Sequence, residues 1–264
     1  MFGFKIDNCI TEENLKYLDS LLYICDEKTP LEIGLECYDT KRYINLDSEI
    51  LTTVFEYFKS RTNNIVHMTL EAKLLNKNKY TEYEWFKIWE KQFKRINKEN
   101  INYIVLHATS EESKILEEQE QIDIICKNYE YVKKMSKFPI YIENTYEDIN
   151  FYQNLFKSID ISANFTFDIG HKKIHSTAHN MKWIDFCDSL LYENRNLHFH
   201  IHDNEGFKDK HKPVSFYKDK KTIDFIQVLK NKYKFSNFIL ENHSSNFDDI
   251  IKEYIYIQSN IYIN

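Results

Sequence analysis

The sequence is poor in the residues that interrupt a chain, with four glycines and three prolines in 264 residues. Neither a G-x-G-x-x-G motif nor a P-loop occurs, so dinucleotide binding and Walker-type phosphate binding are unsupported. No Pro/Gly/Ser-rich stretch divides the chain, and its length suits one α/β barrel. We therefore expect a single domain that spans residues 1–264.

Disulfide and membrane signals are also missing. The five cysteines are odd in number, widely spaced and without a C-x-x-C motif, which predicts free thiols in a reducing cytosol. No apolar run approaches the roughly 18 residues that cross a bilayer, and the N-terminus lacks a signal-peptide pattern. The net charge of −6 argues mildly against a surface that coats nucleic acid, although a local basic groove is compatible with it. We expect a soluble, cytoplasmic protein with no membrane partner.

What the chain does have is a regular alternation of short apolar segments with longer amphipathic ones. The predicted strands are Phe2–Ile6, Leu31–Cys37, Asn64–Met68, Ile101–His107, Phe138–Glu143, Ala163–Asp168, Asn196–His202 and Asn237–Glu241. The clearest helical patterns are Glu12–Ile24, Glu84–Ile96, Glu117–Met135 and Phe247–Ile257, and Thr11 and Thr222 are predicted N-caps. Eight such units favour a closed (β/α)₈ TIM barrel with a parallel sheet, and an open doubly wound sheet is the alternative.

Six consecutive predicted strands end in a histidine or an acid. These strand-end residues are His67, His107, Glu143, Asp168, the His-Phe-His-Ile-His run 198–202, and Glu241. In a (β/α)₈ barrel the C-terminal strand ends meet at one mouth, where the active sites of such enzymes lie. Several buried acids around one point need a cation, and mixed imidazole and carboxylate ligands suit Zn²⁺, Mn²⁺, Fe²⁺ or Co²⁺ better than Ca²⁺. The pattern therefore predicts a divalent metal site at the mouth.

A single strand-end histidine more often only bonds a backbone carbonyl, so the histidines differ in what they predict. His198 lies deeper on its strand and is predicted to be a hydrogen-bonded interior residue. His175 and His179 favour solvated or substrate-edge roles over metal binding, and His243 could take either role. The safest candidates to share one metal are Glu143, Asp168, His200 and Glu241.

The strand-end pattern resembles that of the xylose isomerase-like barrel superfamily, from about Asn64 to Glu241 and only weakly over the first sixty residues. That superfamily includes proteins labelled sugar phosphate isomerase/epimerase and also endonuclease IV, the apurinic-site DNA repair nuclease. In endonuclease IV-like members nine side chains hold three metals. The resemblance implies a counterpart for each: His67, His107, Glu143, Asp168, His171, His200, Asp209, His211 and Glu241.

The most specific matches are Ile-Glu-Asn-Thr (142–145), Asp-Ile-Gly-His (168–171) and Asp-Lys-His (209–211). The segment that follows His107 departs from the nuclease, because it lacks the glycine-containing stretch found there, and the segment that follows His211 lacks the glycines expected in either branch. The resemblance therefore implies the fold and a centre of one to three divalent metals, with Zn²⁺ or Mn²⁺ expected, more directly than it implies the reaction.

Two reactions fit such a centre. An isomerase or epimerase of a sugar or sugar phosphate would move a proton beside a metal-chelated carbonyl, with Glu143 and Glu241 as the catalytic carboxylates and His202 and Lys210 binding substrate. The lysine-rich segment 208–221 could hold a substrate phosphate or simply be solvated. The stretch His-Ile-His-Asp-Asn and the missing glycines favour this reaction over the next one.

The alternative is hydrolysis of a phosphodiester in abasic DNA by a multinuclear centre, with nucleic acid as the partner. The nine candidate ligands support it, because one metal needs only about four. A barrel that binds metal or ligand without catalysis is the third reading. Burying so many acids close together is energetically unfavourable for a scaffold alone, so we rank this hypothesis last.

Overall fold

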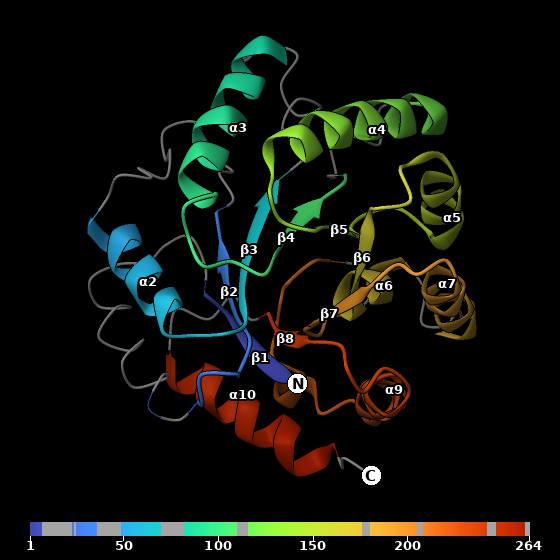
Figure 1. Cartoon of the computed structure of the whole chain (residues 1–264). Helices are drawn as coiled ribbons and strands as arrows, with labels where there is room; N and C mark the ends of the chain where they lie inside the picture. Colours follow the sequence, from blue (N-terminus) through green and yellow to red (C-terminus); the bar gives the residue numbers. More distant parts are fainter. Residues whose placement is uncertain are drawn as a thin grey trace.

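The computed structural model describes residues 1–6, 23, 25–35, 49–69, 82–109, 116–175, 180–204, 208–241 and 247–261. Its eight strands form a closed, all-parallel barrel in which each strand pairs with its neighbour in sequence and β1 pairs with β8. The helices surround the barrel on the outside (Figure 1). The predicted (β/α)₈ TIM barrel is confirmed.

The strands agree with the sequence predictions within a few residues. They are β1 (Phe2–Ile6), β2 (Leu31–Gly34), β3 (Asn64–Thr69), β4 (Tyr103–His107), β5 (Ile140–Glu143), β6 (Asn164–Asp168), β7 (Leu197–Ile201) and β8 (Phe238–Leu240). The predicted second strand is shorter than expected, since only Leu31–Gly34 pairs and the residues from 36 lie outside the described part.

The described helices are α2 (Glu49–Lys59), α3 (Glu82–Ile96), α4 (Glu118–Met135), α5 (Ile149–Ser158), α6 (Ile169–His175), α7 (Asn180–Tyr192), α8 (Val214–Tyr217), α9 (Lys220–Lys232) and α10 (Phe247–Asn260). The predicted helix Glu12–Ile24 and its cap Thr11 lie almost wholly outside the described residues. None of the helices in the described ranges is long and apolar enough to cross a membrane.

The predicted N-cap at Thr222 is wrong. Helix α9 begins two residues earlier, and the Asp219 side chain accepts a hydrogen bond from the Lys221 backbone N–H. Thr222 lies inside the first turn, where its hydroxyl donates to the Asp219 carboxylate. A carboxylate accepts from the helix N-terminus at least as well as a hydroxyl, so Asp219 takes the cap position.

Two separate apolar layers support the barrel. The larger lies between the strands and the helices and includes buried Phe165, Phe199 and Trp89. The smaller consists of Ile65, Tyr103, Val105, Tyr141 and Ile239. Because strand side chains alternate between faces, members of this smaller layer lie on the same strand faces as residues of the polar mouth, as Tyr141 does with Glu143.

The pairing register brings the strand-end residues side by side. His107 pairs with Glu143 across β4 and β5, and Asp168 pairs with His200 across β6 and β7. Three described cysteines, Cys25, Cys126 and Cys187, are free thiols, as predicted, and the other two lie outside the described residues.

Candidate metal centre

The structure brings all nine predicted ligands to the C-terminal mouth of the barrel, where they form three groups. Within each group one ligand atom from every residue lies within 4.8 Å of the others. The groups are His67, His107 and Glu143; Glu143, Asp168, His200 and Glu241; and His171, Asp209 and His211 together with His202. A fourth group that meets the same condition consists of His67, His200 and a residue that was not predicted, Glu32. Their roles as ligands stay predictions, because the geometry shows proximity alone.

Glu143 belongs to two of the groups. Its Oε2 lies 2.9 Å from His67 Nε2 and 3.3 Å from His107 Nε2, while its Oε1 lies 3.1 Å from His200 Nδ1. Glu241 Oε2 lies 2.9 Å from the same nitrogen, His200 Nδ1. One carboxylate could therefore bridge two neighbouring cations.

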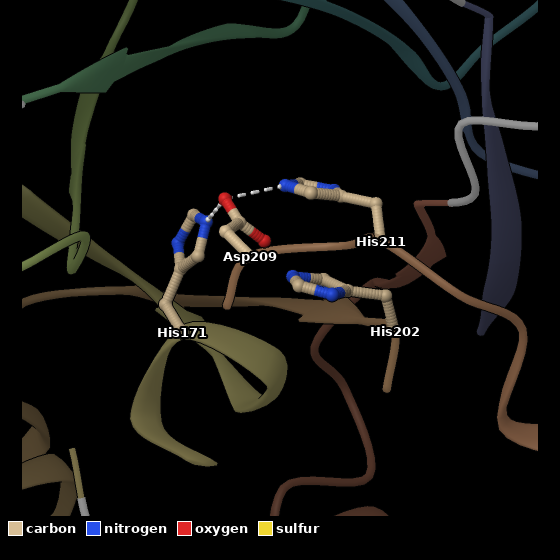
Figure 2. A group of neighbouring side chains, drawn as sticks. All are labelled: His171, His202, Asp209 and His211. Atoms are coloured by element: carbon tan, nitrogen blue, oxygen red, sulfur yellow. Dashed lines mark hydrogen bonds and ion pairs between the residues drawn. The ribbon is translucent and has the colours of Figure 1, made fainter. Parts of the chain in front are cut away.

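The residues of the third group come from α6 and from the segment that follows β7. Asp209 Oδ2 lies 3.0 Å from both His171 Nε2 and His211 Nε2, and Figure 2 shows this carboxylate between the two imidazoles. The ring of His202 stacks on that of His211, with 3.9 Å between centroids and 7° between planes. The backbone N–H of His211 donates to Asn204 Oδ1, which fixes the loop that presents it.

Burial and charge agree with a site built for cations. Burial raises the pKa of Glu143, but the neighbouring His200, His107 and His67 together hold the pKa well below its usual value. Burial also raises the pKa of Glu241, and Lys5 and His200 outweigh it in the same way. Both carboxylates are therefore ionised at neutral pH, as metal ligands must be.

The same side chains leave lone pairs unused. Glu143 Oε2 and Glu241 Oε2 are buried, and neither accepts a hydrogen bond of good geometry within the described structure, although imidazole nitrogens lie close by. Ligand atoms that face a common point rather than one another are what a metal requires, so these residues fit a divalent cation such as Zn²⁺ or Mn²⁺.

Two further charged residues of the centre were missed by the sequence predictions. Glu32 on β2 is fully buried; its Oε1 lies 3.0 Å from His67 Nδ1, and its Oε2 lies 3.1 Å from His200 Nε2. Lys5 on β1 is also buried, and its ammonium group contacts Glu241 and His67 Nδ1. The signal that could have found them is a single charge inside an otherwise apolar short strand.

Glu32 touches the imidazole nitrogens that point away from the proposed metals. The nitrogens of His67 and His200 that face Glu143 are Nε2 and Nδ1, respectively. The opposite nitrogens, Nδ1 and Nε2, both face Glu32. The hydrogen bond between His200 Nε2 and Glu32 Oε2 fixes the His200 tautomer that leaves Nδ1 free to bind a metal, whereas His67 Nδ1 is shared between Glu32 and the Lys5 ammonium group.

His198 is a hydrogen-bonded interior residue, as predicted. Its Nδ1 lies 2.8 Å from the Tyr103 hydroxyl, and its Nε2 lies 3.2 Å from Glu32 Oε2. Asn237 donates in turn to the Tyr103 hydroxyl at 2.8 Å. Burial lowers the pKa of His198 to about 4, so this histidine is neutral.

The remaining candidates have mixed outcomes. His202, predicted to bind substrate, lies among the third group, and its Nε2 is 2.9 Å from Asp168 Oδ1. The backbone N–H of Lys210 donates to Asn204 Oδ1, and its role toward substrate stays a prediction. The side chain of His175, at the end of α6, and all of His179 and His243 lie outside the described part.

Several solved structures resemble this barrel in fold. Endonuclease IV from Thermus thermophilus superposes with a TM-score of 0.67 at 11% identity, with 98% of each chain covered. A sugar phosphate isomerase/epimerase from Parabacteroides distasonis gives a TM-score of 0.56 at 11% identity, with 98% of this chain and 100% of that chain covered. The chain therefore has the fold of the xylose isomerase-like TIM barrels.

A third similar structure, the IolI protein with a bound zinc atom, gives a TM-score of 0.62 at 12% identity over 100% of this chain and 99% of that chain. No family model matches the sequence, and no curated protein matches it either. The similarity is thus one of fold, and the reaction has to be argued from the centre itself.

Proposed function

We propose that this protein is a metal-dependent phosphodiesterase of the endonuclease IV kind, which cleaves the backbone of DNA at an abasic site. The observation that carries the proposal is the sharing of Glu143 between two groups of ligand side chains, with a third group beside them. A sugar isomerase with one metal would need only the group that contains Asp168, His200 and Glu241. The sequence alone favoured the isomerase, and the arrangement of the nine side chains reverses that order.

The metals would supply an activated hydroxide and would stabilise the leaving oxygen, as multinuclear centres with ions about 3.5–4 Å apart do. The chain's own residues hold this geometry. Glu143 lies between the first two groups, and Asp209 lies between His171 and His211 in the third. His202 Nε2 lies 3.0 Å from Asp168 Oδ2 and so would hold that carboxylate in place between the second and third groups.

The test uses untagged protein, because a histidine tag would add metal. Elemental analysis should find more than one divalent ion per chain, and abasic DNA should be nicked in a chelator-sensitive way. Glu143→Gln should lose both metal and nicking, since it removes a ligand of two groups. Glu120→Gln, an exposed change on α4, is the matched control and should retain both.

Isomerisation or epimerisation of a sugar or sugar phosphate is the second candidate. The position of Glu143 and Glu241 favours it, because their oxygens lie 3.1 Å and 2.9 Å from the same His200 nitrogen. Two carboxylates this close to one point could act as the acid and the base on one chelated substrate. In heavy water this reaction would place deuterium on the carbon beside the substrate carbonyl, whereas hydrolysis would not. Such exchange, together with intact abasic DNA, would reverse our ranking.

A further inference from the structure

A small cavity adjoins the metal centre on the far side of His202. It has a volume of about 70 Å³ and lies between α6, the first residue of α7 and the first turns of α9. Its walls include Ile169, Lys172, Lys173, Asn180, His202 and Phe225, with Asp219, Lys221 and Thr222 at the α9 side. At roughly 10–15 Å³ for each water position, the cavity has room for about five waters, which is enough space for one phosphate or sulfate group.

Lys172 is the unusual residue of this cavity. Lys172 is only 6% exposed, yet within the described structure its ammonium group forms no ion pair with a carboxylate. The ammonium group donates to Asn180 Oδ1 and lies 4.5 Å from the centre of the Phe225 ring. A buried ammonium group normally has an anionic partner, because burial removes its hydration.

The neighbouring lysine, Lys173, does pair with carboxylates. Lys173 Nζ lies 2.6 Å from Asp203 Oδ1 and 3.1 Å from Asp219 Oδ2, so these two acids are already matched with a cation. Lys221 adds a second positive charge at the rim.

On the His202 side of the cavity there is a second buried polar atom that lacks a hydrogen-bond partner within the described residues. His202 Nε2 contacts Asp168, but His202 Nδ1 is buried and meets no hydrogen-bond partner in the described residues. Its ring therefore lies between the metal centre on one side and the cavity on the other (Figure 2 shows the ring beside His211 and Asp209). A ligand in the cavity would be next to the reacting centre.

We propose that this cavity binds a phosphate group, with Lys172 as its main counter-charge. The bound oxyanion would give the Lys172 ammonium the anionic partner that it lacks and would add charge-assisted hydrogen bonds. The group could come from a sugar monophosphate or from a phosphate of a nucleic acid, and the chemistry of recognition is the same for both. The inference does not depend on which reaction the metal centre performs.

The test measures anion binding to the metal-loaded protein by calorimetry. Sulfate is the first probe, because it has the shape and charge of a phosphate but binds transition metals weakly. Lys172→Met should weaken sulfate binding about tenfold to a hundredfold, the loss expected for a charge-assisted contact. Lys220→Met, which removes an exposed lysine paired with Asp224, is the matched control and should bind sulfate as the wild type does.

Thermal unfolding separates this role from a merely structural one. Without anion, Lys172→Met should be at least as stable as wild type, because it removes a buried charge that has no acidic partner. Sulfate should raise the melting temperature of wild type and of Lys220→Met, but not that of Lys172→Met. Equal binding of sulfate by wild type and Lys172→Met, or no binding by wild type, would overturn the proposal.

Two further ligands identify the source of the phosphate. A sugar monophosphate and a short abasic oligonucleotide are titrated against wild type and Lys172→Met. The ligand whose affinity falls in the variant is the one that places a phosphate in the cavity. If neither affinity falls, the proposal is wrong.

Discussion

Glu32 offers the sharpest test of how the centre is organised, because it is not among the nine predicted ligands. Its carboxylate contacts the nitrogens of two predicted ligands that face away from Glu143, His67 at 3.0 Å and His200 at 3.1 Å. A third imidazole nitrogen, that of His198, lies 3.2 Å away. We predict that Glu32→Gln lowers metal affinity while leaving every proposed ligand in place.

The magnitude follows from what the amide can still do. One oxygen of the carboxylate becomes an NH₂ group, which cannot accept a hydrogen bond from a ring N–H. Whichever way the amide turns, either the hydrogen bond to His200 Nε2 or the contact with His67 Nδ1 is lost. Loss of such a partner costs about 10–100-fold in metal affinity, or about 1.4–2.7 kcal/mol.

Competition with a fluorescent chelator would measure the affinity of each variant for Zn²⁺. The control is Glu253→Gln, since Glu253 is equally buried but accepts hydrogen bonds from the backbone of Val214 and Ser215 rather than from an imidazole. Wild-type affinity in Glu32→Gln, with a melting temperature lowered as in Glu253→Gln, would show that Glu32 serves the fold alone and would refute the argument.

Three further predictions follow from the same geometry. A methyl group in Gly170→Ala would collide with the His202 ring, so we expect it to displace that ring and to lower activity about tenfold or more with little change in helix content; unchanged activity would contradict this contact. Burial lowers the pKa of His200, but Glu32, Glu143 and Glu241 raise it well above its usual value overall. A metal must therefore displace a proton at neutral pH, and Zn²⁺ affinity should rise with pH from about 6 toward 8; a flat profile would argue against His200 as a ligand. Asp148→Ala removes the N-cap of α5 and should cost about 1 kcal/mol of stability in urea unfolding. It should leave the metal content unchanged, so a loss of metal would show that the centre is coupled to that helix.

The sequence was sufficient to predict the barrel because eight short apolar runs alternate with amphipathic segments, and the last six runs end in a histidine or an acid at the mouth. His107 and Glu143 illustrate this: each ends an apolar run, and the register then places them side by side. Parallel pairing in chain order puts such ends at one edge without any knowledge of side-chain packing.

Glu32 and Lys5 could not be found in the same way. Each lies inside its strand rather than at its end, and a charge there reads as an exposed residue of an edge strand. Only closure of the barrel, in which β1 pairs with β2 and β8, turns both inward and buries them. The cavity beside Lys172 depends on the packing of α6 against α9, which periodicity does not specify.

Because Glu143 belongs to two groups of proposed ligands, binding of one metal ion would affect binding of the next. An ion held by His67, His107 and Glu143 would immobilise the carboxylate that the neighbouring group also uses. The second ion would then meet a ligand whose entropy has already been lost, so its binding would be favoured by the first. Loading would be cooperative, and partially filled protein would be scarce at intermediate metal concentrations.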